Sequence, residues 1–155
     1  MKCAIKRDIL QRLEVLKMRL WHKDLIPVLP LDQLKGEWSE LSAIAGKILL
    51  RGTPNHRLVN KVLDCPLEHF ITYGDLIYRE RLKRGLKASM SVRNKIFSVS
   101  PTDEKVIYEE LFSEWHTDRY LRQCYYNLQE KYDCGGLTDE EWERIEKLVV
   151  NRLFD

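Results

Sequence analysis

The chain has 155 residues, which suits one domain with a buried core. Its 26 Lys and Arg residues against 24 Asp and Glu residues leave a net charge of +2, too small to indicate a partner by itself. No apolar run approaches about 18 residues and no secretory signal peptide is recognisable, so we expect no membrane span. The four cysteines and four histidines lack zinc-ligand spacing. We therefore expect no metal, and unpaired thiols in the cytoplasm.

The first third of the chain predicts a helix, a connection and a longer helix. Residues 3–21 have apolar positions at helical spacing, which indicates either an extra helix or a translated leader. Residues 25–30 contain two prolines and predict an extended connection. Residues 31–50 predict an amphipathic helix. Its expected buried stripe is Leu31, Leu34, Trp38, Leu41, Ala45 and Ile48.

The opposite face of the 31–50 helix carries a candidate acid/base residue, Glu40. This face comprises Gln33, Gly36, Glu40, Ala43 and Lys47. The neighbours of Glu40 one turn before and one turn after are Gly36 and Ala43, so a ligand could approach the carboxylate closely. The alternative is a solvated glutamate whose neighbouring glycine serves helix packing.

Two further helices are expected in the middle of the chain. Gly52 should end the long helix, and Thr53-Pro54 should cap a short helix that runs to about Asp64. The next helix should run from Pro66 to Gly85, followed by one turn around Val92 to Phe97. His56 lies in the first turn of the short helix, where backbone amides favour a phosphate. It could equally be a surface histidine.

The last third predicts a long helix and a final one. Ser100 to Asp103 should open a helix that Thr117-Asp118 divides or kinks and that stops at Gly135-Gly136. Thr138 and Glu141 form a capping-box pattern for a last helix through residue 153. The late aromatics predict core lining, with base stacking as the alternative; they are Trp115, Tyr120, Tyr125, Tyr126 and Tyr132. The sequence therefore predicts an all-α, compact single-domain bundle of about five to seven helices.

The charges are unevenly distributed. Residues 76–95 hold seven bases and one acid, whereas residues 101–118 hold six acids and one base. A basic patch is typical of a phosphate-binding surface. The candidates are Arg81, Lys83, Arg84 and Lys87, near the expected helix end. The alternative is a solvated helix C-terminus, which favours cations in any case.

Several runs resemble the pyrimidine dimer DNA glycosylase family, whose best-known member is a small phage enzyme. They are Met18-Arg19-Leu20, Leu31-Asp32-Gln33-Leu34, Glu37-Trp38-Ser39-Glu40-Leu41 and Arg81-Leu82-Lys83-Arg84-Gly85-Leu86. The resemblance covers roughly residues 18–87. It implies a helical glycosylase-like domain over residues 18–155, with residues 1–17 as an extension or a mis-assigned start. It also implies damaged or abasic double-stranded DNA as partner, and no cofactor.

The mechanism that the resemblance implies needs an amine and a carboxylate. The amine attacks C1′ of the damaged nucleotide to form a Schiff base. Glu40 matches the carboxylate that assists sugar opening and β-elimination. The family's amine is the α-amine of its processed N-terminus, where a small second residue is exposed. A start at Met18 would place a terminus there, but the bulky Arg19 that follows would leave Met18 in place. Lys47 and Lys23 are the alternative amines. Arg19, His22 and Lys23, beside this start, join the candidate DNA contacts.

The chain departs from the phage enzyme at three positions near Glu40. Ser39 and Ala43 stand where that enzyme has arginines, and Gln33 stands where it has a histidine. The sequence therefore leaves two functions open. One is a base-excision glycosylase with AP-lyase activity. The other is a non-catalytic protein on the same scaffold that binds nucleic acid or a partner.

Overall fold

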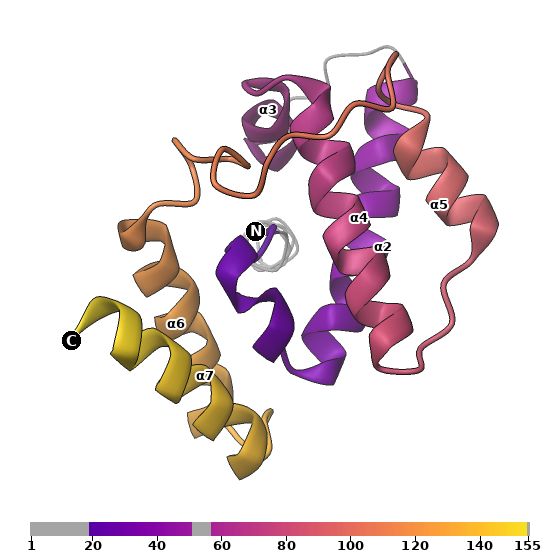
Figure 1. Cartoon of the computed structure of the whole chain (residues 1–155). Coiled ribbons are helices and arrows are strands. Elements are labelled where there is room, and N and C mark those ends of the chain that lie inside the picture. Colours follow the sequence, from indigo (N-terminus) through magenta and orange to yellow (C-terminus); the bar gives the residue numbers. More distant parts are fainter. Residues whose placement is uncertain (1–18, 51–56, 155) are drawn as a thin grey trace, which may run out of the picture.

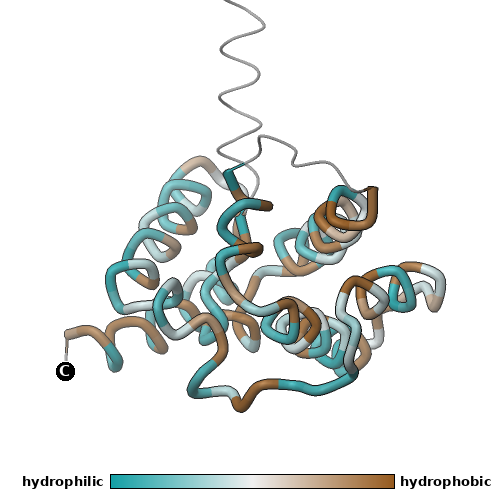
Figure 2. Tube along the Cα trace, turned by 90° about the horizontal axis from the view of Figure 1, so that it is seen from above, coloured by the Kyte–Doolittle hydropathy of each residue, from teal (hydrophilic) through white to brown (hydrophobic). Residues whose placement is uncertain are grey.

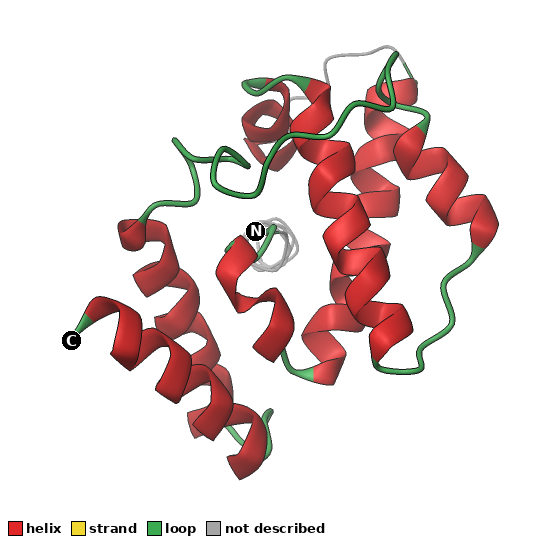
Figure 3. Cartoon of the chain, in the orientation of Figure 1, coloured by secondary structure: helices red, strands yellow, loops and turns green. Residues whose placement is uncertain are grey.

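The computed structural model describes residues 19–50 and 57–154. These residues form a short 3-10 helix and six α-helices, with no strand among them (Figures 1 and 3). The elements are η1 (Lys23–Val28), α2 (Leu31–Leu49), α3 (Arg57–Leu63), α4 (Leu67–Lys83), α5 (Met90–Phe97), α6 (Asp118–Asp133) and α7 (Asp139–Leu153). The predicted all-α fold is confirmed. The expectations for residues 3–18, Gly52, Thr53-Pro54 and His56 fall outside the described residues.

The helices form two groups with η1 between them (Figure 1). One group packs α2 against α3, α4 and α5, and the other pairs α6 with α7. The short η1 helix contacts both α4 and α7. Hydrophobic and hydrophilic residues alternate along the helices (Figure 2), as amphipathic helices around a shared core require. No helix in the described part of the chain is long and apolar enough to cross a membrane.

The predicted stripe of α2 is largely buried. Leu34, Leu41 and Ala45 are fully buried and Trp38 nearly so. Leu31 was placed wrongly, because it is the first residue of the helix and is 41% exposed. The side chain of Glu37, which the periodicity did not assign to the core, is 1% exposed.

Three predicted helix ends are confirmed. Gly85, after α4, has a φ of 73°, and the N–H of Leu86 donates to the carbonyl of Arg81. Gly135 has a φ of 80° and ends α6 in the same way. The capping box of Thr138 and Glu141 opens α7 with both of its reciprocal bonds.

The extended connection predicted for residues 25–30 is wrong over most of its length. Residues 23–28 form η1, and the extended backbone is confined to Leu29 and Pro30. The His22 side chain caps η1 by accepting from the Asp24 N–H. A short 3-10 helix tolerates Pro27 because few of its N–H groups have helical acceptors.

The helix predicted to open at Ser100–Asp103 is absent, and residues 101–117 consist of bends, turns and irregular backbone. Side chains from elsewhere satisfy the backbone of this segment. Thr72 accepts from the Val106 N–H at 3.0 Å, and His69 accepts from the Phe112 N–H at 3.0 Å. The segment therefore does not need helical hydrogen bonds, and α6 begins only after its cap, Thr117.

Two smaller expectations also changed. The single turn expected within residues 92–97 is the eight-residue helix α5, capped by Ser89. Core lining is confirmed for Tyr125 and Tyr132, which both stack on Trp142 between α6 and α7. Tyr126, by contrast, is 54% exposed.

Candidate functional site

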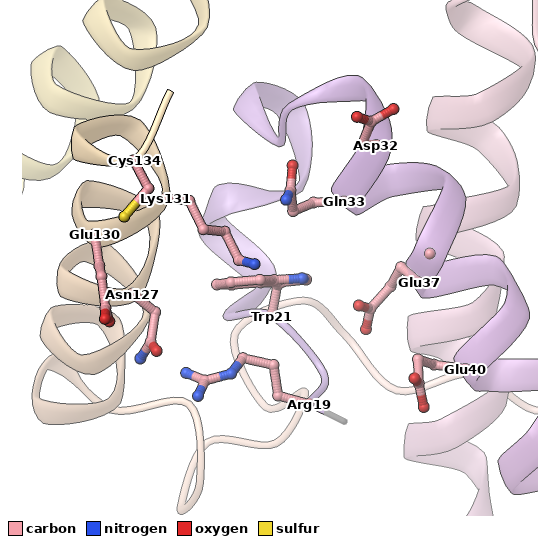
Figure 4. Close-up of a pocket in the computed structure, with 11 residues that line it drawn as sticks. Arg19, Trp21, Asp32, Gln33, Glu37, Glu40, Asn127, Glu130, Lys131 and Cys134 are labelled. Atoms are coloured by element: carbon pink, nitrogen blue, oxygen red, sulfur yellow. The ribbon is translucent and has the colours of Figure 1, made fainter. Parts of the chain in front are cut away.

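A pocket of about 500 Å³ lies between α2 and α6, with Trp21 between its walls (Figure 4). The α2 wall consists of Asp32, Gln33, Gly36, Glu37 and Glu40. The α6 wall consists of Asn127, Glu130, Lys131 and Cys134. Arg19 completes the lining beside Trp21. The volume falls within the range of ordinary small-ligand sites.

The α2 wall contains most of the face that the sequence singled out. Gln33, Gly36 and Glu40 all line the pocket, whereas Ala43 and Lys47 are not among the lining residues. A Cβ atom added at Gly36 would have no neighbour within 4 Å outside its own helix. The glycine therefore keeps the space one turn before Glu40 open.

Glu40 presents an unsatisfied acceptor at this wall. Its Oε2 atom is buried and has no hydrogen-bond partner, and the Oε1 atom of Gln33 is in the same state. Burial raises the pKa of Glu40, and the charge of Lys47 partly opposes the increase. Buried acceptors without partners are costly, so both atoms are suited to receive donors from a ligand.

Glu37 is a site residue that the sequence reasoning missed. Its Oε1 atom lies 3.0 Å from the hydroxyl of Tyr73, which also donates to the carbonyl of Trp21 at 2.8 Å. Burial raises the pKa of Glu37 well above the usual range. The available signal was a second carboxylate one turn before Glu40, inside the same family-like run.

Two cations line the pocket from opposite sides. The guanidinium of Arg19 lies 5.3 Å from the centre of the Trp21 ring, and Lys131 extends from α6 toward the same ring (Figure 4). Arg19 was among the sequence candidates, but Lys131 was not. No local pattern could have found Lys131, because only the tertiary fold brings α6 and α2 to the same pocket.

His22 and Lys23, by contrast, are buried and bonded within the protein. His22 Nε2 lies 2.9 Å from the carbonyl of His116, and the backbone N–H of Lys23 donates to His116 Nδ1 at 2.9 Å. The Lys23 ammonium donates to the carbonyls of Tyr108 and Leu111. Burial lowers the pKa of His22 to about 4 and that of His116 to about 2. These side chains hold residues 108–116 in place, so we do not include them in a DNA surface.

The predicted basic helix end divides into structural and exposed residues. Arg84 donates to Glu80 and to the carbonyls of Leu29, Ile26 and Pro27, so it joins α4 to the end of η1. Arg81 donates to the carbonyl of Lys87 and lies over the Trp38 ring. The side chains of Lys83 and Lys87 are exposed. Of the four candidate phosphate contacts, Arg84 is therefore the one whose guanidinium is most engaged within the protein.

The described residues contain no group of three or more His, Cys, Asp and Glu side chains that could hold a metal ion. Cys65, Cys124 and Cys134 are free thiols. Cys134 lines the pocket and is exposed, but it is a single thiol on a helix cap.

The family model for pyrimidine dimer DNA glycosylase matches residues 18–94, about half of the chain. Over these residues the chain belongs to the pyrimidine dimer DNA glycosylase family. No curated protein and no solved structure matches the chain. The family match supports a glycosylase-like function in general, with DNA as the substrate. It includes the α2 wall of the pocket and ends before the α6 wall.

Proposed function

We propose that this protein is a base-excision glycosylase with AP-lyase activity on damaged or abasic double-stranded DNA. The observation that carries the proposal is the partnerless carboxylate oxygen of Glu40. It lines an open pocket beside Gly36, on a helix that lies inside the family match. A cytoplasmic setting is part of the proposal, because the described cysteines are free thiols.

In the proposed reaction an amine forms a bond to C1′ of the damaged nucleotide, and the base leaves with its bonding electrons. Opening of the sugar then gives an imine between C1′ and the amine. Glu40 removes a proton from C2′, and the phosphate on C3′ leaves with the C3′–O electrons. A carboxylate with a raised pKa and a free oxygen is suited to accept that proton.

The amine has two sources near the pocket. Arg19 lines the pocket, so a chain that starts at Met18 would carry its α-amine one residue from the lining. Lys131 lines the opposite wall and carries a side-chain amine. Lys23 is a poor candidate because its ammonium is bonded to the carbonyls of Tyr108 and Leu111. Lys47 is not among the lining residues. We propose the α-amine of a chain that starts at or near Met18.

Borohydride trapping on abasic-site DNA tests both the reaction and the amine. Four proteins are compared: chains that begin at Met1 or at Met18, each with Lys131 or with Lys131→Arg, which keeps the charge and removes the primary amine. We expect trapping of the Met18 chain with or without Lys131. Peptide mapping should place the adduct on the α-amine, and the intact mass of natively expressed protein should identify the start.

Other outcomes have defined meanings. Trapping that Lys131→Arg abolishes in both chains would make Lys131 the nucleophile. If none of the four proteins is trapped or cleaves abasic DNA, the alternative applies, a non-catalytic binding protein on the same scaffold. The departures from the family at Ser39 and Ala43, which leave no arginine beside Glu40, favour that alternative.

A further inference from the structure

Glu37 and Glu40 form a carboxyl pair on one face of α2. They lie one turn apart and both line the pocket, with their carboxyl groups directed to the same side (Figure 4). Their surroundings differ. Glu40 is half-buried with a free oxygen, whereas Glu37 is 1% exposed and lies against Tyr73 of α4.

The hydrogen bonds around Tyr73 depend on the protonation of Glu37. The Tyr73 hydroxyl has one hydrogen but two close acceptors, the carbonyl of Trp21 at 2.8 Å and Oε1 of Glu37 at 3.0 Å. If Glu37 were ionised, both acceptors would compete for that hydrogen. If Glu37 carries a proton, it can donate to the Tyr73 oxygen while Tyr73 donates to Trp21. Only the second arrangement makes both contacts hydrogen bonds at the same time.

Some groups around Glu37 raise its pKa and others lower it. Burial is the largest influence and raises its pKa, and the like charge of Glu40 on the same helix adds to the increase. The hydrogen bond from Tyr73, a backbone hydrogen bond from Trp21 and the charge of Arg19, in the segment before η1, lower it. Tyr120 of α6 interacts with Glu37 and is itself neutral, because burial raises its pKa far above neutrality. The net direction for Glu37 is well above the usual range.

We propose that Glu37 is held as a neutral carboxylic acid and is the proton donor of the site, while Glu40 is the ionised base. This inference rests on the proposed function. Once the amine nitrogen is bonded to C1′, the hydroxyl of Glu37 turns from Tyr73 toward the substrate. The C1′–O4′ bond then breaks, O4′ takes the proton of Glu37, and the imine forms. Glu40 then removes the C2′ proton as the phosphate leaves. Transfer of that proton from Glu40 to Glu37 restores both groups.

The protonation state can be tested without any activity, through thermal stability against pH. Glu37→Gln keeps the shape and a donor toward Tyr73, and it cannot ionise. An acid whose folded pKa exceeds its unfolded value stabilises fully below the unfolded pKa and loses that contribution as pH rises toward the folded pKa. The melting temperature of Glu37→Gln relative to wild type should therefore increase from pH 4 to pH 8. Glu40→Gln, at a half-buried position, is the matched control and should show a smaller increase.

The melting temperature of Glu37→Gln could instead stay at or below that of wild type by the same difference from pH 4 to pH 8. That result would overturn the proposal that Glu37 is a neutral acid. A second measurement needs no variant. NMR of wild-type protein labelled at the glutamate carboxyl carbons should show one carboxyl still protonated at pH 7. A titration in which every glutamate is ionised by pH 6 would contradict the proposal.

Single-turnover cleavage of abasic DNA tests the proton-donor role. With increasing pH, the wild-type rate should first rise as Glu40 ionises and then fall as Glu37 ionises. Glu37→Gln should be about 10-fold to 100-fold slower and should lose the alkaline fall. An unchanged rate and profile in Glu37→Gln would exclude the role. If wild type does not cleave at all while the stability pattern holds, the proposed function fails and the neutral Glu37 stands.

Discussion

The two walls of the pocket differ in burial and in origin. The α2 wall lies inside the family match and presents buried acceptors, namely Glu37, Oε2 of Glu40 and Oε1 of Gln33. The α6 wall lies outside the match, and its Glu130, Lys131 and Cys134 are exposed. Buried groups have fixed positions and perturbed proton affinities, whereas exposed side chains can adjust to a ligand. We therefore expect changes on α2 to affect the rate and changes on α6 to affect binding.

The pocket exists only while the two halves of the chain are docked together. Hydrogen bonds at His22, Lys23 and Leu31 are among the contacts that link the N-terminal segment and α2 to the second half. His22 and Lys23 bind the backbone and ring of His116, and the N–H of Leu31 donates to Glu141 of α7 at 3.0 Å. Conditions that loosen these contacts should separate the α6 wall from the α2 wall.

The largest effect is expected from Glu40→Gln on the α2 wall. The substitution keeps the shape of the side chain and removes the ionisable group. Single-turnover cleavage of abasic DNA should fall about 10²-fold or more, the usual scale for loss of a general acid or base. DNA affinity, measured by fluorescence anisotropy, should be nearly unchanged.

Glu68→Gln serves as a control for this experiment, because Glu68 lies in the first turn of α4 and does not line the pocket. It should cleave at the wild-type rate. If Glu40→Gln cleaves as fast as wild type, the role given to Glu40 is excluded and the difference between the walls loses its main support.

The next effect concerns the contact between the halves, at acid pH. His22 and His116 have an ordinary pKa of 6.5, which burial lowers to about 4 and about 2 in the folded protein. Their contribution to stability is present above pH 6.5 and is lost as pH falls toward the folded values. A pH of 5 lies about 1.5 units below the ordinary pKa of each histidine. Each ring therefore loses about 2 kcal/mol of its contribution to the unfolding free energy at that pH.

His116→Gln measures this effect against wild type in denaturant melts at pH 7 and pH 5. Gln can accept from the Lys23 N–H and does not titrate, so its stability deficit should shrink by about 2 kcal/mol between the two pH values. The comparison with wild type cancels Glu37, which acts in the opposite direction. A deficit of equal size at both pH values would show that His116 does not control the docking.

The sequence predicted the parts of this protein whose causes are local. The stripe of α2 and the ends of α4 and α6 follow from periodicity, from glycines with positive φ and from caps, each within a few residues. The helix predicted from residue 100 is absent because the prediction used local capping residues, whereas hydrogen bonds from distant residues determine the backbone there. Thr72 and Lys23, about 34 and 88 residues away in sequence, bind its backbone.

The residues of the site divide in the same way, into those that a local pattern predicts and those that only the tertiary fold brings into the site. Glu40 and Gly36 were predicted because one helix face carries both of them. Glu37 was missed because its environment comes from Tyr73 and Trp21, and Lys131 was missed because only the packing of α6 places it near the pocket. His22 and Lys23 were proposed as DNA contacts because they lie beside the family-like start at Met18. Their burial depends on His116, which the sequence did not connect with them.

A smaller effect is expected from Lys131→Ala on the α6 wall, if Lys131 binds DNA and is not the nucleophile. Loss of one charge beside the pocket should weaken binding of abasic DNA by about 10-fold at low salt, and it should leave the bound-state cleavage rate within about twofold. Lys147→Ala, an exposed change of the same type on α7, is the control and should do neither. A change in the cleavage rate with unchanged binding would contradict the assigned roles of the walls.

The smallest effect is expected at the end of α4, away from both walls. Lys83 and Lys87 are exposed, so changing both to Ala should lower the slope of log K against log salt by up to about 2 units on any DNA sequence. Unfolding free energy should change by under about 0.5 kcal/mol. Arg84→Ala removes bonds to Glu80 and to three carbonyls, so it should destabilise the fold by about 1–3 kcal/mol. A double lysine variant with an unchanged salt slope would mean that this end of α4 is only a solvated helix terminus, and that the phosphates contact the surface around Arg19 and Lys131.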